Sequence, residues 1–242
     1  MIYKIIENIK ILIIALIIAV LIRSLLFQPF YIPSSSMEPS LLVGDRIFVS
    51  KYAYGYSRHS FPFSPPILNG RIFFSKPDYG DLIVFKTPAD NRTDFIKRLI
   101  GLPGDEIQII KGELFINKKK VSRNMIANRS DIRCAGYENE VLEFKEQLPN
   151  ERTHVAVYKK EGSMLNTDAY IVPEKHYFFL GDNRDCSKDS RFLSSVGYVH
   201  ENNLVGKARF IFFSSDSRKA SIFKFWKWPE IIRLNRFFKK IN

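Results

Sequence analysis

The sequence predicts a mainly β protein, in which an N-terminal transmembrane helix precedes an antiparallel β domain with a smaller β lobe inserted in it. Three observations support this class. An apolar run lies within the first thirty residues, and helical periodicity is scarce after Pro29. Short strand-like runs follow, several of which alternate apolar with polar residues, and turn residues bound them. Alternation of apolar and polar residues over four to eight positions is typical of half-buried strands. Residues 117–172 are more polar, which predicts the lobe.

The N-terminal segment predicts one membrane anchor. Residues 11–22 form an uncharged apolar run, which Arg23 interrupts before it continues to Gln28. From Ile11 to Gln28 a helix would be about 27 Å long, close to the hydrocarbon thickness of about 30 Å. A removable signal peptide is the alternative. Because no small-x-small cleavage site follows the run, we expect an uncleaved anchor.

Charge predicts the orientation and the kind of surface that the chain contacts. Lys4 and Lys10 precede the apolar run and only Glu7 offsets them, so the N-terminus is expected in the cytoplasm. The net charge of +12 favours phospholipid head groups or nucleic acid. Residues 216–242 hold eight Lys and Arg against two acids, interleaved with Phe and Trp. This tail is expected to lie on a membrane surface, or else to pack as an amphipathic helix on its own domain.

Strand-like runs define the β domain. They lie at residues 46–51, 81–86, 95–101, 106–112, 113–119, 154–159, 176–181 and 204–213. Lys111 and Gly112 form a hairpin turn between two of them, and the Pro-rich and aromatic stretch 61–70 is expected to be a surface excursion. The predicted division is an anchor at 1–29, a core at 30–116 and 173–215, the lobe at 117–172 and the tail at 216–242.

Cys134 and Cys186 are the two cysteines. They are too few for a disulfide framework and lack paired zinc spacing. One disulfide remains possible in an oxidising compartment, but the sequence favours two free thiols.

A calcium-binding loop that starts at Asp182 does not match the required pattern, because its third and sixth positions are Arg184 and Ser187. We therefore expect no metal and no organic cofactor.

The stretch YIPSSSMEPS, at residues 31–40, is the first that could carry chemistry. Three consecutive serines follow the anchor, yet no histidine lies in a triad motif and there is no GxSxG elbow. A serine nucleophile here would need another base, such as a lysine whose pKa is lowered by burial. The alternative is a polar loop that leaves the membrane.

A candidate base lies in DFIKRLIGLPGDEI, at residues 94–107. Lys97 and Arg98 interrupt an apolar strand, and neighbouring strand residues point to opposite faces. We therefore expect one of these two cations to face inward, where a buried Lys97 could act as a general base. The alternative is an exposed lysine whose stem packs on the strand.

The third stretch, GDNRDCSKDSR at residues 181–191, is dense in turn formers and charges. Asp189 and Arg191 could form an ion pair, and Ser187 could orient a lysine amine. A charged surface turn is the alternative.

Taken together and in this order, these stretches resemble the bacterial type I (leader) signal peptidase family, which are Ser-Lys membrane proteases. The resemblance covers nearly the whole chain and is carried by residues 27–55, 80–86, 94–105 and 181–191. It implies that Ser36, which precedes a methionine, is the nucleophile and that Lys97 is the general base. It also implies that Ser34 and the Ser36 backbone N–H form the oxyanion hole.

The resemblance implies supporting roles for further residues. Ser187 would hydrogen-bond the lysine, and Asp182, Asp189 and Arg191 would support the site. The implied substrate pockets comprise Phe30, Ile32, Pro33, Met37, Leu41, Ile47, Val84, Asp94, Phe95 and Ile96. Small pockets of this kind suit alanine at the first and third residues before the cut, because larger side chains are excluded sterically.

The implied function is a membrane-bound serine endopeptidase that removes N-terminal signal peptides from exported preproteins. Its implied place is the bacterial inner (plasma) membrane, crossed once, with the catalytic domain on the outer, periplasmic side. The expected partners are signal peptides, phospholipid and, transiently, the secretion machinery, without nucleic acid. Ser35 and Phe95 depart from the residues common in relatives, glycine and tyrosine, and one transmembrane segment is visible where many relatives have two.

Two other functions compete with this one. A self-cleaving Ser-Lys protease of the phage-repressor type would carry a DNA-binding domain where this chain has its apolar run. A membrane-tethered basic protein that binds nucleic acid or lipid through its tail would have no protease activity.

Overall fold

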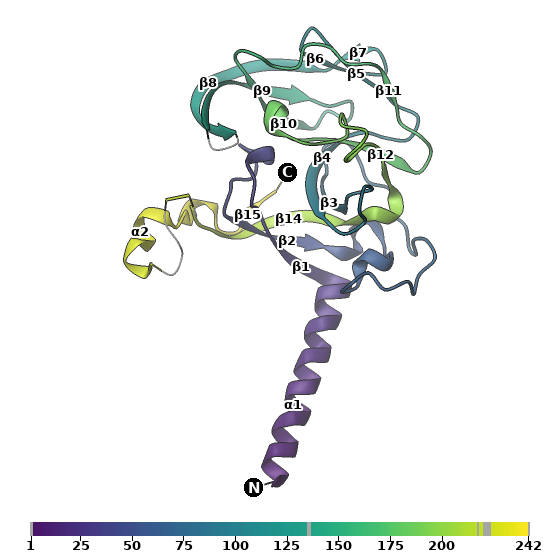
Figure 1. Cartoon of the computed structure of the whole chain (residues 1–242), viewed down its shortest axis with the longest axis vertical. Coiled ribbons are helices and arrows are strands. Elements are labelled where there is room, and N and C mark those ends of the chain that lie inside the picture. The colour runs from purple at the N-terminus through teal and green to yellow at the C-terminus, as the bar shows by residue number, and fades with distance from the viewer. Residues whose placement is uncertain (1, 135–136, 217, 220–223, 242) are drawn as a thin grey trace.

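A long helix projects from a β-rich body in the computed structural model, which describes residues 2–134, 137–216, 218–219 and 224–241 (Figure 1). The helix comprises α1 (Ile2–Leu21) and a π-helical end, Ile22–Leu26. By length and composition, Tyr3–Leu26 could cross a membrane. It begins earlier than the expected start at Ile11 and ends before Gln28, which belongs to a strand. The proline at position 29 cannot continue a helix.

The main sheet has eight antiparallel strands and begins directly after the helix. Its order is β1 (Phe27–Tyr31), β2 (Asp45–Ser50), β14 (Leu204–Ser214), β3 (Leu82–Lys86), β4 (Asp94–Gly101), β12 (His176–Leu180) and β13 (Val199–His200), and β15 (Lys239–Lys240) pairs with β14. Both faces of this sheet are buried. Leu82 and Val84 pack in one apolar cluster, whereas Ile83 and Phe85 of the same strand pack in another.

Two smaller sheets complete the predicted mainly antiparallel β architecture. One consists of β11 (Tyr170–Ile171), β5 (Glu106–Ile110), β6 (Glu113–Ile116) and β7 (Lys119–Lys120). The predicted hairpin turn joins β5 to β6, and both of its residues have positive φ, 51° at Lys111 and 74° at Gly112. The other sheet consists of β8 (Ser122–Cys134), β9 (Tyr137–Gln147) and β10 (Thr153–Lys159).

The β8–β10 sheet lies beside the segment that carries the GDNRDC motif. Val157 of β10 forms a parallel bridge with Asn183, and β8 contacts the short turn Ser35–Met37 (Figure 1). Residues far apart in the sequence therefore meet at the serine cluster.

The excursion and the tail have little regular structure. Residues 61–70 contain no helix or strand, and Phe63 and Ile67 are exposed. The tail contains only α2 (Trp228–Ile231), short 3-10 turns and β15 among its described residues, so the alternative of a long amphipathic helix is wrong for this part of the chain. The tail contacts the β domain through the buried Arg236, whose Nη2 lies 2.6 Å from Asp45 Oδ2 of β2. Residues 220–223, which include Phe223 of the predicted aromatic tail, lie outside the described part.

Candidate active site

The serine cluster forms a tight turn that the core and a neighbouring segment hold in place. Ser35–Met37 is a 3-10 turn after β1, and Met37 is completely buried in the core. The carbonyl of Ser36 accepts a 3.1 Å hydrogen bond from the N–H of Asn183, whose side-chain amide donates to the Ser35 carbonyl at 3.2 Å. The turn is therefore fixed from both sides, and Ser36 is only 7% exposed.

Lys97 lies directly against the hydroxyl of Ser36. Its Nζ is 2.6 Å from Ser36 Oγ, and the residue is 3% exposed. Burial lowers the pKa of Lys97 from 10.5 to about 8, although the carboxylates of Asp189 and Asp182 act in the opposite direction. An amine with this pKa is neutral in about a tenth of the molecules at pH 7, far more than for an unperturbed lysine. The geometry therefore suits proton transfer from Ser36 to Lys97.

Ser34 lies at the open side of the same turn. Its Oγ is 3.3 Å from Ser36 Oγ, and the residue is exposed. A hydroxyl in this position can rotate toward an oxygen atom bound next to Ser36.

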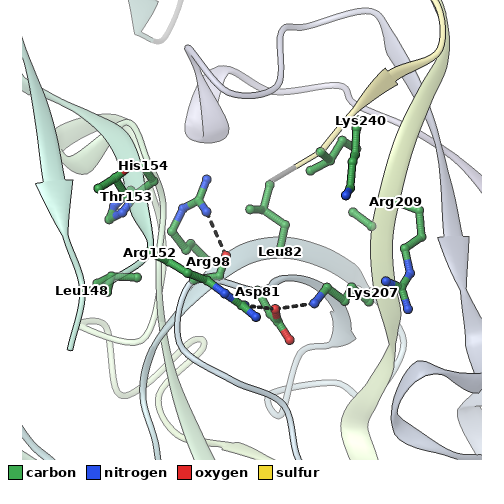
Figure 2. A pocket seen from close by; sticks show the side chains of 13 residues that line it. Asp81, Leu82, Arg98, Leu148, Arg152, Thr153, His154, Lys207, Arg209 and Lys240 are labelled. Carbon is green, nitrogen blue, oxygen red and sulfur yellow. Dashed lines mark hydrogen bonds and ion pairs between the residues drawn. The ribbon is translucent and has the colours of Figure 1, made fainter. Parts of the chain in front are cut away.

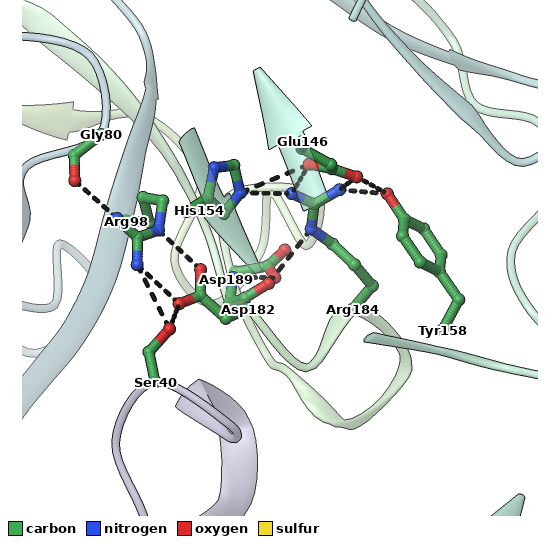
Figure 3. A network of polar contacts seen from close by, with 10 residues as sticks. Ser40, Gly80, Arg98, Glu146, His154, Tyr158, Asp182, Arg184 and Asp189 are labelled. Carbon is green, nitrogen blue, oxygen red and sulfur yellow. Dashed lines mark hydrogen bonds and ion pairs between the residues drawn. The ribbon is translucent and has the colours of Figure 1, made fainter. Parts of the chain in front are cut away.

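The next residue of β4, Arg98, is also buried, which corrects the expectation that one of the two cations faces inward. Lys97 and Arg98 point to opposite faces, but both faces of the sheet are covered. The guanidinium of Arg98 forms a bidentate ion pair with Asp182 at 2.7 and 2.8 Å and donates to the Gly80 carbonyl (Figure 3). Burial raises the pKa of Asp182, but Arg98, His154 and Ser40 together outweigh burial, so that pKa is lowered.

Asp189 and Arg191 form the ion pair expected from the sequence. Arg191 Nε and Nη2 lie 2.8 and 2.9 Å from the two carboxylate oxygens, and both residues are buried. The second oxygen also accepts the N–H of Gly181 at 3.0 Å. The Asp189–Arg191 pair therefore stabilises the segment around Gly181 and Asn183, which binds the Ser36 turn.

Ser187 is buried beside the site without the hydrogen bond to Lys97 that the sequence led us to expect. Its Oγ has no hydrogen-bond partner among the described residues. It lies against Gly181, where an added Cβ would be 2.2 Å from Ser187 Oγ and 2.5 Å from the Ser36 carbonyl oxygen. Only glycine fits at this close approach.

A cavity of about 420 Å³ opens beside Ser36 and Lys97. Eight of the expected pocket residues line it: Phe30, Ile32, Pro33, Ile47, Val84, Asp94, Phe95 and Ile96. Met37 and Leu41 do not line it, because both are completely buried in the core cluster beneath. Four lining residues were missed in the sequence, Tyr31, Thr93, Cys186 and Lys188, although each is in or directly beside one of the motifs.

Cys134 and Cys186 form a disulfide, so the expectation of two free thiols is wrong. Their Cα atoms are 5.5 Å apart across a sequence separation of 52. The β8–β9 hairpin carries Cys134 to the 3-10 turn Arg184–Cys186, an approach that no local pattern indicates. The bridge thereby ties the β8–β10 sheet to a wall of the cavity.

A buried network of charged and polar side chains lies behind this segment, and its members Glu146, His154 and Tyr158 were not foreseen from the sequence (Figure 3). Arg184 pairs with Glu146, whose carboxylate also accepts from Tyr158 at 2.6 Å and faces His154 at 3.3 Å. Burial raises the pKa of Glu146, but Arg184, His154 and Tyr158 together outweigh burial, so that pKa is lowered. Arg184 Nε donates to the Gly181 carbonyl at 3.2 Å, so the network positions the segment that holds Ser36.

Metal ligation has no support in the described part of the chain. Among those residues there is no group of three or more His, Cys, Asp or Glu side chains that could hold a metal ion.

Comparisons with known proteins agree with the motifs. A family model described as "Signal peptidase, peptidase S26" matches residues 5–213. Signal peptidase I of Rickettsia conorii is 43% identical, over 93% of this chain and 88% of that protein. Signal peptidase I of Rickettsia rickettsii is 42% identical over the same shares.

A crystal structure of a signal peptidase I from Enterococcus faecalis V583 is 26% identical, covers 55% of this chain and 97% of that chain, and has a TM-score of 0.32. The assignment depends on the family model and the two sequence relatives rather than on this superposition. The resemblance inferred from the ordered motifs is confirmed, and the chain belongs to the signal peptidase family, peptidase S26.

Proposed function

We propose that this protein is a membrane-anchored serine endopeptidase that removes signal peptides from exported preproteins with a Ser-Lys pair. The observation that carries the proposal is the 2.6 Å contact between Lys97 Nζ and Ser36 Oγ inside a family of signal peptidases. It is supported by the burial that lowers the pKa of the lysine to about 8.

In the proposed mechanism, neutral Lys97 takes the proton of Ser36 as Oγ attacks the carbonyl carbon before the cut. The resulting oxyanion accepts hydrogen bonds from the Ser34 hydroxyl and the Ser36 N–H. Lys97 then gives its proton to the leaving amine of the mature chain, which leaves an ester on Ser36. Lys97 next removes a proton from water as the water attacks that ester. The same proton returns to Ser36 Oγ, and the signal peptide departs with a carboxylate.

The cavity supports a preference for small residues before the cut. Its walls are mostly apolar side chains on β1–β4, including Phe30, Ile47, Val84 and Ile96. Because these walls belong to packed strands, a larger substrate side chain would require them to move. We therefore propose alanine at the first and third positions before the cut.

Supporting roles follow from the neighbouring groups. The Ser187 hydroxyl, which has no hydrogen-bond partner among the described residues, lies close to the Ser36 turn and would orient the amine of Lys97 by rotating toward it during the reaction. Asp182, Asp189 and Arg191 would hold the segment that positions Asn183.

The anchor helix motivates the proposed location. The chain would cross the bacterial inner membrane once, with the N-terminus in the cytoplasm and the catalytic core, residues 30–116 and 173–215, on the periplasmic side. Residues 117–172 would form the inserted lobe. The tail, residues 216–242, would rest on anionic lipid through its lysines and through exposed aromatic rings such as Phe225, Trp226 and Phe238. Contact with the secretion machinery would be transient.

Cleavage of a preprotein with an Ala-x-Ala site by the detergent-solubilised protein tests the function. The wild type and Ser75→Ala, a change at an exposed serine outside the site, are expected to cut after the final alanine. Ser36→Ala is expected to leave the preprotein intact. Full cleavage by Ser36→Ala would contradict the assignment of the nucleophile. If the wild type also failed to cut but bound lipid or nucleic acid, a non-enzymatic role of the basic tail would replace the proposal.

A further inference from the structure

A second cavity, of about 390 Å³, lies apart from Ser36 and Lys97 (Figure 2). Arg98 lines it, whereas Lys97 lines the cavity beside Ser36, so the two cavities lie on opposite faces of β4. Its other walls come from β3, β14, β15 and residues 148–154, which lead into β10. No residue that lines this second cavity takes part directly in the proposed proteolysis. Arg98 supports the proteolytic site through its ion pair with Asp182.

Positive charge dominates the lining of this cavity. Five cations line it, Arg98, Arg152, Lys207, Arg209 and Lys240, against the single carboxylate of Asp81. Asp81 pairs with both Arg152 and Lys207. Behind the wall, Arg152 also pairs with Asp78, and Arg98 pairs with Asp182. Five positive charges less these three carboxylates leave +2. In the described part of the chain, Arg209 and Lys240 form no ion pair with a carboxylate.

His154 adds a buried polar atom that lacks a partner. The residue is 6% exposed, and its Nδ1 has no hydrogen-bond partner among the described residues. Nε2 lies 3.3 Å from both Arg184 Nη2 and Glu146 Oε2, and the other ring nitrogen is on the side that faces Arg98 (Figure 3). Both His154 and Arg98 line the cavity. The buried nitrogen therefore lies at the wall of a cationic space.

One neutral tautomer of His154 offers a hydrogen-bond donor to an anion in this cavity. Burial lowers the pKa of His154, so the ring is neutral and carries one proton near pH 7. Nε2 contacts both a guanidinium, which can only donate, and the Glu146 carboxylate, which can only accept, so these contacts fit either neutral tautomer. The tautomer that accepts from Arg184 carries its proton on Nδ1, where it is a buried donor without an acceptor. An anionic oxygen in the cavity would supply that acceptor.

We propose that this cavity is a binding site for a phosphate-type oxyanion. A dianion would neutralise the local charge of +2 and accept hydrogen bonds from Arg209, Lys240 and the Nδ1–H tautomer of His154. Arginine and lysine at one site suit phosphate oxygens through charge-assisted hydrogen bonds. The phosphate could belong to a soluble compound or to a lipid head group.

Occupation of the cavity would join two parts of the molecule. The anion would bridge residues 148–154 to β14 and β15 and would lie next to the Arg98–Asp182 pair. Asn183, which follows Asp182, donates its N–H to the Ser36 carbonyl. The site would therefore stabilise the contact between the sheets from behind the serine turn.

Binding of inorganic phosphate to the full chain tests the proposal without proteolysis. The Ser36→Ala protein is held in a maltoside detergent, which contains no phosphate, and titrated by calorimetry and by ¹⁵N NMR of the four histidines. We expect saturable binding at one site and movement of the His154 Nδ1 signal. Loss of charged hydrogen bonds in Arg209→Gln/Lys240→Gln should weaken binding about tenfold or more. The exposed Lys240→Gln alone, which removes no packed side chain, should weaken it in the same direction.

A matched control is Lys76→Gln, which removes an exposed lysine outside the cavity and should bind phosphate as the parent does. The proposal is wrong if binding is not saturable, if chloride at equal ionic strength gives the same response, or if Lys240→Gln and the double variant bind unchanged. Vesicles distinguish the sources. If phosphatidylglycerol but not phosphatidylcholine displaces phosphate, the ligand is a lipid head group; if neither does, it is a soluble phosphate compound.

Discussion

Lys97 and Arg98 are consecutive residues of β4 whose cations are buried on opposite faces of the sheet, one beside Ser36 and the other beside Asp182. The surroundings of the two cations differ in whether a carboxylate balances the buried charge. Lys97 has no carboxylate in hydrogen-bond contact among the described residues, so burial lowers its pKa, whereas Arg98 is neutralised by a bidentate partner. One strand thus carries both the proposed base and the ion pair that supports the site.

Breaking the Arg98–Asp182 pair should destabilise the fold strongly. Arg98→Met leaves the carboxylate of Asp182 buried without its cation, which costs about 3–5 kcal/mol. Urea unfolding of the detergent-solubilised protein measures the loss. The control is Lys120→Met, which breaks the exposed Lys120–Glu113 pair and should cost less than about 1 kcal/mol. Equal losses in the two variants would contradict the role given to the buried pair.

Lys97→Met should abolish cleavage and yet stabilise the protein. The folded state lowers the pKa of Lys97 from 10.5 to about 8, so below pH 8 folding must keep a charged amine buried. This cost amounts to as much as about 3 kcal/mol at pH 7 and disappears as the pH rises from about 8 to above 10.5. Unfolding of wild type and variant at several pH values tests this. A variant less stable than the wild type at pH 7 would contradict it.

Ser34→Ala should lower kcat about 100-fold with little change in KM, because an oxyanion-hole donor acts mainly in the transition state. Ser34→Thr keeps a hydroxyl and should recover part of the loss. Steady-state cleavage of a peptide with an Ala-x-Ala site separates the two constants. If Ser34→Ala kept the wild-type kcat, the oxyanion would have to be bound by other donors.

Removing the Cys134–Cys186 bridge should cost about 2–4 kcal/mol in unfolding free energy, since it closes a long loop. Cys134→Ser, Cys186→Ser and the double variant should lose similar amounts. A reductant should bring the wild type to the same stability and leave the double variant unchanged. A wild type that does not respond to reductant, with two titratable thiols in the native protein, would show that the bridge is not formed.

The sequence predicted the fold class and much of the candidate site because those signals are local. Short apolar runs within residues 81–86 and 95–101 marked the central strands, and the residues around Ser36 and Lys97 lie in short motifs whose order along the chain is distinctive. Eight cavity residues followed from the same motifs. The apolar run before Pro29 likewise indicated a helix long enough for an anchor, although the helix begins earlier than this run, at Ile2.

The remaining features depend on contacts between distant residues. Arg98 is buried because the second face of the sheet is also covered. The sequence of β4 alone does not reveal this second layer. The disulfide and the Glu146–Arg184 pair need the β8–β10 sheet to dock on residues 181–186. Met37 and Leu41 were placed in the pockets because of their motif, but the turn directs both into the core.

The pH dependence of kcat/KM for cleavage tests the proposed Ser-Lys mechanism most directly. Because Lys97 must be neutral to accept the proton of Ser36, kcat/KM should rise with pH through a value of about 8 and then level off. The exposed Lys76→Met should retain this profile, whereas Lys97→Met should show no activity at any pH. A profile that is flat across this range, or cleavage that persists in Lys97→Met, would show that another group takes the proton.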